Sequence, residues 1–564
     1  MTWLPRRILI AVALRRAARL FATFRQQASR LARVQESVLL DKIRRNADSA
    51  FGRDHRFDRI RDVTTFQRHL PVAGYEACVP YIERVQAGDT RALFGPGQHL
   101  RMFARTSGTT GAAKLIPVTE VCFRDYRRAG LLWGLGAVRA HPRILDGNIF
   151  SLVGDWDEYR TTAGIPCGSV SGLIRVSQTY VARARCCPPD CAMRVQDVRA
   201  KYYLALRLAL AQPAVSMAAA ANPATLLGLV AVANEHKESL VRDLADGTFS
   251  PPGPVPAAVR DALRRLLRRR HPERVRQLEQ ILGRTGGLLP RDVWPDLALL
   301  GTWTGGTMGA YLRRLPALFG DVAVRDLGLL ASEGRLTLPL EDGTPAGVLD
   351  VASHFYEFIP VEEAEAARPT VLLAHELREG AAYFILLTTS GGLYRYHIGD
   401  VVRCVGHWGE APVLEFLHKG SHCCSLAGEK LTEFQVAESV RRALDDLDLE
   451  ITAYTLAPCW DDPPYYALLL EARDAPAPGQ GQSLARRVER HLSALNIEYR
   501  SKRQTLRLGP VQPRLVPTGT WAEFDAKRRG QLGGSSEQYK HPCLVADLDL
   551  VPKLTGAEQS VPSP

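Results

Sequence analysis

The sequence has no apolar run near its N-terminus that is long enough to cross a bilayer. The stretch Ile8–Leu14 ends after seven residues at Arg15 and Arg16, whereas a spanning helix needs about 20. A basic start before a short apolar run also occurs in signal peptides, but no clear small-residue cleavage site follows. We therefore predict an amphipathic basic helix packed on the large domain, without stable membrane insertion. Loose contact with a membrane surface is the alternative.

The eleven cysteines lack the spacing of a zinc site. Cys186, Cys187 and Cys191 lie close together, but no paired cysteine spacing and no nearby histidine accompanies them. An odd number of cysteines without regular spacing is typical of reduced thiols. We expect a cytoplasmic protein without a structural metal centre at this cluster.

Charge of one sign is not gathered into a tail, although the net charge is +12. The one dense run lies in a helix-like stretch, where such a run is more often a solvated face than a binding patch; it comprises Arg264, Arg265, Arg268, Arg269 and Arg270. Binding of nucleic acid would rest on net charge alone, and we do not expect it. At 564 residues the chain is too long for one core, which indicates two or more domains.

What the chain does contain is a loop suited to phosphate. Residues 103–119 read FARTSGTTGAAKLIPVT. Glycines allow backbone N–H groups to approach an anion, hydroxyls add short donors, and lysine adds a mobile charge. No Gly-Lys-[Ser/Thr] triplet opens a helix, so this is not a Walker A loop. The predicted phosphate-binding residues are Thr106, Ser107, Gly108, Thr109, Thr110, Gly111 and Lys114.

Two carboxylates follow buried apolar runs further along the chain. Ser332-Glu333-Gly334 comes after the run 322–330, at the predicted carboxyl end of a strand, where α/β sheets bind ligands. Asp400 precedes Val401-Val402, which predicts a strand start or turn. A hard oxygen ligand at Glu333 suits Mg²⁺, and a carboxylate at Asp400 can accept hydrogen bonds from both hydroxyls of a ribose. Each signal alone is weak, because an isolated Ser-Glu-Gly triplet is not specific and Gly-Asp is a common turn.

The order of predicted elements indicates an α/β fold. Strands and helices alternate through the first three hundred residues, and a strand-rich stretch follows. Residues 161–177 are rich in glycine, serine and threonine, so we expect a loop that walls a substrate pocket. Beyond about residue 419 a compact α+β domain is expected. We predict domains at residues 1–418 and 419–564.

Three motifs in order identify a family resemblance. The run TSGTTGAAK resembles the phosphate loop of the adenylate-forming superfamily of acyl-CoA synthetases, peptide-synthetase adenylation domains and luciferases. The preceding FGRDHRFDRI (Phe51–Ile60) and LPVAGYEACVPYIERVQAGD (Leu70–Asp89) are similar to the acyl-acid-amido synthetases of the auxin-responsive Gretchen Hagen 3 family. SEG at residues 332–334 and YRYHIGD at residues 394–400 resemble that family's later motifs. The resemblance implies a large N-terminal adenylate-forming domain, a small mobile C-terminal domain, and the use of ATP with Mg²⁺.

The resemblance also implies roles for single residues around the nucleotide. Glu333 would hold magnesium, Asp400 would bind the ribose, and Ala331 with Ser332 would lie beside adenine. The family usually has an aromatic residue four positions before the glutamate, where this chain has Leu329. Candidate residues of the substrate pocket are Trp303, Thr304, Gly305 and Gly306.

The family's C-terminal features are present as well. Lys419-Gly420 matches the position of the interdomain hinge, although the arginine that the family usually has near His418 is missing. Lys430 matches a lysine that contacts the nucleotide. Lys540, in GSSEQYK at residues 534–540, matches the lysine that reaches from the small domain into the active site.

The reaction implied by the resemblance joins a small-molecule carboxylic acid to an amino acid. ATP would activate the acid as an acyl-adenylate with release of pyrophosphate, and the amine would then displace AMP to give an amide. Two alternatives stay open: a ligase that passes the acyl group to coenzyme A, and a non-catalytic scaffold that kept the fold. The sequence does not name the acid, and it leaves the oligomeric state open.

Overall fold

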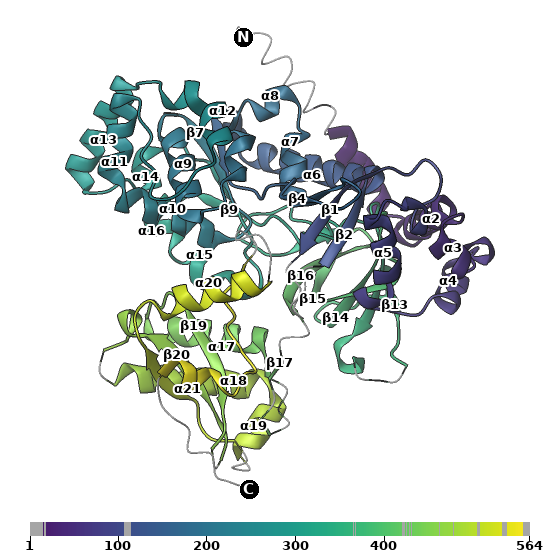
Figure 1. The fold of residues 1–564 in the computed structure, drawn as a ribbon. Coiled ribbons are helices and arrows are strands. Elements are labelled where there is room, and N and C mark those ends of the chain that lie inside the picture. The colour runs from purple at the N-terminus through teal and green to yellow at the C-terminus, as the bar shows by residue number, and fades with distance from the viewer. Residues whose placement is uncertain are drawn as a thin grey trace.

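The computed structural model describes residue 15 and residues 18–106, 114–364, 366, 368–419, 423–424, 426–427, 429, 431–461, 463–477, 479–504, 508–532 and 539–555. Figure 1 shows a broad upper body formed by the earlier residues and a smaller lower body formed by the later ones. The described part of the chain contains no helix long and apolar enough to cross a membrane.

A parallel sheet lies at the centre of one half of the upper body. Its strand order is β6-β3-β7-β8-β9, with β3 at Asn148–Ser151, β6 at Cys186–Cys187, β7 at Val215–Ala219, β8 at Leu299–Gly301 and β9 at Ala323–Arg325. Parallel strands need crossover connections, which are usually helical. Here the connections include α9 (Val198–Leu210), α10 (Pro223–Glu235), α11 (Lys237–Asp246), α12 (Ala257–Leu267), α13 (Pro272–Thr285), α14 (Pro290–Val293), α15 (Gly309–Leu312) and α16 (Leu315–Phe319).

Two stretches with a helical pattern are each divided into two helices. The first begins after Asn222, whose side chain accepts from the Ala224 amide, and breaks at His236 into α10 and α11. The helix-like stretch 256–284 is α12 and α13. The arginines between residues 264 and 270 are all exposed, which agrees with a solvated face.

A four-stranded sheet carries the predicted phosphate loop. Its order is β2-β1-β5-β4, with β1 at Leu100–Thr106, β2 at Lys114–Thr119, β4 at Tyr159–Arg160 and β5 at Pro166–Gly168. β1 and β2 are antiparallel, and Thr106 pairs with Lys114. The helix α6 (Glu120–Ala140) follows directly, and Thr119 caps it by accepting from the Cys122 amide.

The expectation of a loop at residues 161–177 is wrong. That stretch contains β5, which pairs with β1, and the helix α7 (Val170–Val176). Its glycines serve close packing: a Cβ on Gly168 would stand 2.5 Å from the Asp155 carbonyl oxygen, and one on Gly172 would stand 2.3 Å from the Gly154 carbonyl oxygen. A composition typical of loops therefore reflects close backbone approach here.

The other half of the upper body is a seven-stranded antiparallel sheet. Its order is β10-β11-β16-β15-β14-β12-β13, with β10 at Thr337–Leu338, β11 at Gly347–Leu349, β12 at Phe355–Pro360, β13 at Leu372–Leu373, β14 at Ala382–Thr388, β15 at Tyr396–Trp408 and β16 at Ala411–Lys419. Asp400 lies inside the long strand β15, next to Gly399 at φ +82°. The prediction that it lies at a strand start or turn is therefore wrong.

N-terminal helices pack against this sheet. They are α2 (Leu31–Asn46), α3 (Ala50–Asp54), α4 (Val63–His69) and α5 (Val79–Gln86). Before them, residues 18–28 are helical, and Phe24 stacks on Trp408 of β15 with 5.4 Å between ring centroids. The described part of the predicted basic helix therefore packs on the protein.

The lower body has hydrophobic cores of its own. It contains β17 (Cys423–Cys424), β18 (Leu431–Thr432) and a three-stranded sheet of β19 (Tyr454–Cys459), β20 (Tyr465–Glu471) and β21 (Gln512–Val516). Its helices are α17 (Glu433–Leu447), α18 (Gln480–Leu495), α19 (Ile497–Gln504), α20 (Thr520–Leu532) and α21 (Leu550–Thr555). Its two clusters of buried residues draw only on residues from Cys424 onward, and the two clusters of the upper body reach no further than Leu414. The expected large α/β part and smaller α+β part are therefore present.

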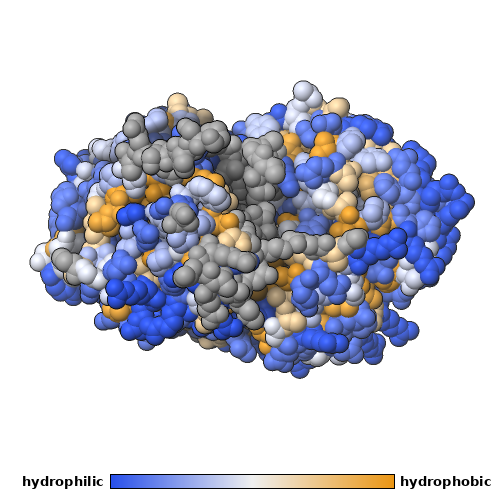
Figure 2. Space-filling model, turned by 90° about the horizontal axis from the view of Figure 1, so that it is seen from below, coloured by the Kyte–Doolittle hydropathy of each residue, from blue (hydrophilic) through white to orange (hydrophobic). Residues whose placement is uncertain are grey.

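Seen from below, the molecule is mainly polar. Figure 2 shows hydrophilic residues over most of the coloured surface, with hydrophobic residues in small separate groups. Scattered apolar residues are normal on a protein surface, so the coloured part of this face gives no sign of a broad docking patch.

A buried ion pair lies where the N-terminal helices meet the YRYHIGD motif at residues 394–400. Arg395 and Glu357 lie 3.0 Å apart with side chains 6% and 1% exposed, and Arg395 also donates to the carbonyl oxygens of Gln67 and Leu70. Removing one partner of such a pair leaves a buried charge unpaired, which typically costs about 3–5 kcal/mol.

We therefore expect Glu357→Ala to lower the thermal unfolding midpoint clearly, measured by circular dichroism. The control is Glu415→Ala, which breaks a more exposed pair of the same sheet, Arg403–Glu415 at 2.7 Å; it should cost about 1 kcal/mol or less. Equal shifts in the two variants would contradict this assignment of the buried pair.

Candidate active site

A cavity of about 210 Å³ lies where the sequence motifs meet. Parallel strands β8 and β9 end at one wall, and β15 with β16 form the other. Ligands of α/β proteins bind outside the carboxyl ends of such strands. The lining includes Trp303, Gly305, Asp326, Leu329, Ala331, Ser332, Glu333, Asp400, Phe416, Lys419 and Lys540.

The loop after β8 is shaped by Asp326, which follows β9. Thr304 donates to Asp326 from its backbone amide at 2.5 Å and from its hydroxyl at 2.8 Å, and the Gly328 amide donates to the other carboxylate oxygen at 2.5 Å. Burial raises the pKa of Asp326, and these hydrogen bonds oppose the shift. Gly306, at φ +63°, lets the loop approach β16, because a Cβ there would meet the Leu417 carbonyl oxygen at 3.3 Å.

Two carboxylates and a lysine line the opposite wall. Lys419, at the end of β16, lies 3.2 Å from Asp400, and this proximity raises the pKa of Lys419. Although that ion pair exists, Oδ1 of Asp400 has no aligned hydrogen-bond donor. Glu333 is buried, which raises its pKa, and accepts a long hydrogen bond of 3.4 Å from the Tyr396 hydroxyl. Both carboxylates therefore have acceptor capacity left for a ligand.

Lys540 reaches this cavity from the lower body. Its ammonium lies 4.9 Å from the ring centroid of Trp303 and 5.3 Å from that of Phe416. Burial lowers the pKa of Lys540, while Asp400, Glu433 and Asp326 raise it. The neighbouring Tyr539 carbonyl accepts from Asn222 of the upper body at 2.7 Å. The structure thus places a charged group from the lower body inside the cavity.

A tyrosine anchors the start of β2, which follows the predicted phosphate loop. The Tyr75 hydroxyl donates to the Leu115 carbonyl oxygen at 3.1 Å and accepts from the Leu115 amide at 2.9 Å, and the Lys114 ammonium lies 5.3 Å from the Tyr75 ring. Ser107, Gly108, Thr109, Thr110 and Gly111, as well as Gly420 and Lys430, lie outside the described residues.

A second cavity of about 540 Å³ adjoins the first. The two share four lining residues, namely Trp303, Leu330, Ala331 and Ser332. The walls of the second cavity come mainly from α6, α7, β3 and β7, and most of its lining is apolar. A charged cavity and an apolar cavity therefore meet at one rim.

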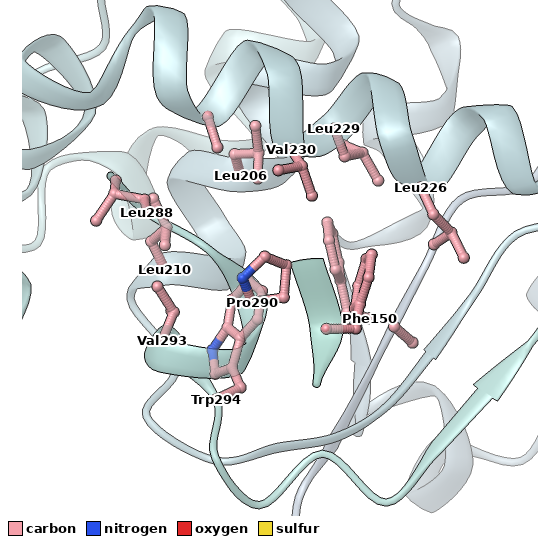
Figure 3. Close-up of a pocket in the computed structure, with 13 residues that line it drawn as sticks. Phe150, Leu206, Leu210, Leu226, Leu229, Val230, Leu288, Pro290, Val293 and Trp294 are labelled. Atoms are coloured by element: carbon pink, nitrogen blue, oxygen red, sulfur yellow. The ribbon is translucent and has the colours of Figure 1, made fainter. Parts of the chain in front are cut away.

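A third void is not a binding site. Figure 3 shows Phe150 of β3, Leu206 of α9, Leu229 of α10 and Trp294 pointing toward one another. The void has about 20 Å³, and its lining residues are apolar. An apolar gap of about one water volume is a packing defect of the core.

Several residues at the site escaped the sequence analysis. Tyr75 lies in the segment similar to the family, but a tyrosine before a strand gives no signal by itself. Asp326 directly follows β9, so the strand-end argument could have found it. The same argument was wrong for Glu333, because the strand ends at Arg325 and Glu333 lies in a turn closed by an isolated bridge between Leu330 and Arg335. Phe416 and the cavity face of α6 could not be found, because their position depends on tertiary packing.

The fold is that of an acyl acid amido synthetase. The solved structure of GH3.15 acyl acid amido synthetase aligns with a TM-score of 0.82 at 21% identity, covering 95% of this chain and 96% of that chain. AtGH3.15 acyl acid amido synthetase in complex with 2,4-DB aligns with a TM-score of 0.83 at 21% identity, covering 95% of each chain.

Family models assign the chain more closely. The GH3 family N-terminal domain matches residues 20–324, the central domain residues 347–419 and the C-terminal domain residues 434–549. The chain belongs to the GH3 family, and the family resemblance expected from the motifs is confirmed.

Curated relatives carry names that agree with the predicted class of enzyme. A probable indole-3-acetic acid-amido synthetase GH3.4 of Oryza sativa subsp. japonica is 28% identical over 531 residues, 88% of this chain and 82% of the relative. The indole-3-acetic acid-amido synthetase GH3.3 of Arabidopsis thaliana is 23% identical, covering 91% of this chain and 89% of the relative. The jasmonoyl–L-amino acid synthetase JAR6 of Nicotiana attenuata is 24% identical, covering 91% of each.

The Tyr75 anchor leads to a local prediction. Tyr75→Phe removes both hydrogen bonds to Leu115, and losing about 1 kcal/mol should speed exchange of that amide about fivefold. Hydrogen exchange of peptides covering residues 114–119 measures this effect.

The matched control is Tyr81→Phe, which removes an exposed tyrosine bond to Asp54 of 2.8 Å and should leave exchange in β2 unchanged. Equal exchange in the Tyr75→Phe variant and the unmodified protein would show that the anchor does not hold the strand.

Proposed function

We propose that this chain is an ATP-dependent acyl-acid-amido synthetase, which joins a carboxylic acid to the amine of an amino acid. Membership of the GH3 family supports the proposal. The observation that carries it is the pair of adjoining cavities, one lined by charged groups and one apolar, that meet at a shared rim. An acid bound in the apolar cavity could present its carboxylate at that rim to a nucleotide in the other.

For the nucleotide, we assign the phosphates to the loop from Thr106 to Lys114, the ribose to Asp400, and adenine to the surroundings of Ala331 and Ser332. The free acceptor capacity of Asp400 supports its part, because a ribose offers two hydroxyl donors. Leu329 lines the cavity where the family usually has an aromatic residue, so its contact with adenine would be aliphatic.

For magnesium, the residues fit a site completed by the nucleotide. Glu333 is a buried carboxylate at the cavity, and the described residues contain no cluster of three or more metal-ligating side chains. Mg²⁺ is commonly held by one or two carboxylates together with phosphates and water. The ion would neutralise phosphate charge, and Glu333 would orient it.

For the chemistry, we propose that Lys540 stabilises charge on the α-phosphate and the carboxylate, with Lys430 as a second nucleotide contact. The acid's carboxylate would attack the α-phosphate and expel pyrophosphate; the amine would then attack the acyl carbon and release AMP. We further propose that the chain divides at residues 418 and 419, and that the C-terminal domain rotates about Lys419-Gly420 between the two steps.

Two alternatives remain distinct from this proposal. A ligase that transfers the acyl group to coenzyme A would use the same cavities, because the motifs surround the nucleotide rather than the acceptor. A scaffold without catalysis would not need a lysine in the cavity. We place the enzyme in the cytoplasm, on the basis of its cysteine pattern.

Acceptor choice tests the proposal directly. With ATP, Mg²⁺ and an acid, AMP release should be faster on adding amino acids than on adding coenzyme A, and the product should be an amide. Chromatography with mass spectrometry separates the products. A thioester formed with coenzyme A alone would favour the ligase alternative, and no acid-dependent pyrophosphate release would favour the scaffold.

Lys540 gives a second test. Lys540→Ala should reduce acid-dependent pyrophosphate release by well over tenfold, since a contact to the transition state should exceed about 1.4 kcal/mol. The control is Lys553→Ala, which removes an exposed lysine of the same part of the chain and should leave the rate unchanged. A near-normal rate in Lys540→Ala would remove this residue from the mechanism.

The same lysine predicts a pH dependence. Only its protonated form can stabilise negative charge, and burial lowers its pKa from the ordinary 10.5. Activity should therefore be lost as pH rises through this lowered pKa. In Lys540→Arg the loss should move to higher pH, because arginine stays protonated.

A further inference from the structure

The apolar cavity extends along the helix α6. It is lined by residues of α6 from Tyr126 to Val138, spaced at three and four positions along one helical face. Twelve residues of α-helix rise about 18 Å. Tyr126 marks the end at the nucleotide cavity, because its hydroxyl donates to the carbonyl oxygens of Ala331 and Ser332 at 2.7 and 3.0 Å.

Two glycines of α6 give the cavity its depth. Gly130 and Gly134 lie one turn apart on the cavity face, and a Cβ added at either would meet no atom within 4 Å. Larger side chains at these positions would project into the cavity. Leu131, also in the lining, is 51% exposed and marks an opening to the surface.

Polar groups are a minority of the cavity lining. The hydroxyls of Ser169 and Ser171 lie 2.8 Å apart, and Ser151 accepts from Arg175 at 2.9 Å. Most of the other lining residues are aliphatic or aromatic, and Arg127, Gln178 and Arg185 are the main polar exceptions. The walls therefore provide area and length chiefly for an apolar ligand.

We propose that the acid is an elongated aliphatic one. This inference rests on the proposed function and specifies its substrate class. The carboxylate lies at the rim shared with the nucleotide cavity, and the tail runs along α6 past Gly130 and Gly134. An extended alkyl chain with bonds of about 1.5 Å advances about 1.25 Å per carbon, so about 18 Å holds about 10 to 14 carbons.

A chain-length series tests the proposal with the full-length enzyme. Acid-dependent pyrophosphate release and amide formation are measured for straight-chain acids from butanoate to hexadecanoate, with phenylacetate and indole-3-acetate as compact aryl acids. The value of kcat/KM should rise by up to about fourfold per added methylene and reach its maximum at about 10 to 14 carbons. A maximum at the aryl acids, or no dependence on length, would overturn the proposal.

Variants at the two glycines locate the tail. Gly134 lies eight residues, about 12 Å of rise, beyond Tyr126. Gly134→Leu should lower the kcat/KM ratio of dodecanoate to hexanoate at least about tenfold, the effect of several lost methylenes. Gly130→Leu, one turn nearer the rim, should shift the preference to still shorter acids. An unchanged ratio in both variants would overturn the proposal.

The controls separate the possible failures. Gly283→Leu places the same side chain on an exposed glycine of the helix α13, where an added Cβ would also meet no atom within 4 Å. This variant should leave the dependence of kcat/KM on chain length unchanged. Leucine is a better helix former than glycine, so none of these substitutions should lower the thermal unfolding midpoint through helix propensity. If the Gly134→Leu variant does not fold, Gly134→Val makes the same comparison. Absence of pyrophosphate release with every acid would refute the proposed function itself, whereas activity that ignores chain length refutes only the substrate class.

Discussion

The placement of one ammonium group connects the two bodies of the molecule. Lys540 loses hydration in the cavity, and the faces of Trp303 and Phe416 with the carboxylates of Asp400 and Asp326 offset part of that cost. The aromatic rings come from the loop after β8 of the parallel sheet and from β16 of the seven-stranded sheet, so the lysine contacts parts of the upper body that belong to two different sheets. The lining of the charged cavity is complete only while the lower body holds this position.

The supporting structure behind the cavity is built from residues distant in sequence. The backbone of Ala73 pairs with the YRYHIGD motif: its amide donates to the Arg395 carbonyl oxygen, and its carbonyl oxygen accepts from the His397 amide. Two residues later, the Tyr75 hydroxyl bonds to β2. One short N-terminal segment therefore sets the distance between the phosphate-loop hairpin and the strand that carries Asp400. This segment lies within Leu70–Asp89, one of the stretches that carry the family resemblance.

Much of this arrangement was predictable, because it follows from local pattern. The strand residues flanking the loop and the helix at Glu433–Leu447 with its Thr432 cap carry their signals within a few residues. The apolar run before Glu333 indicated a strand, but that strand ends at Arg325. The stretch 161–177 misled because glycine promotes loops and close packing alike. The position of Asp400 was mispredicted because a Gly-Asp pair occurs both in turns and in bulged strands. Which face of α6 lines a cavity depends on which neighbouring elements pack against the helix. Those neighbours are distant in sequence, so the local pattern of α6 does not predict the cavity.

The two cavity glycines of α6 also bear on how this protein could be engineered. Glycine inside a helix costs about 1 kcal/mol relative to alanine, and both positions have open space for a larger side chain. A stability-guided redesign would therefore choose Gly130 and Gly134 among its first substitutions, and each gain in melting temperature would narrow the binding volume. Under the substrate class proposed above, the two glycines lower helix stability and enlarge the space for the acid. Selection for stability and selection for longer substrates would then act on the same two codons in opposite directions.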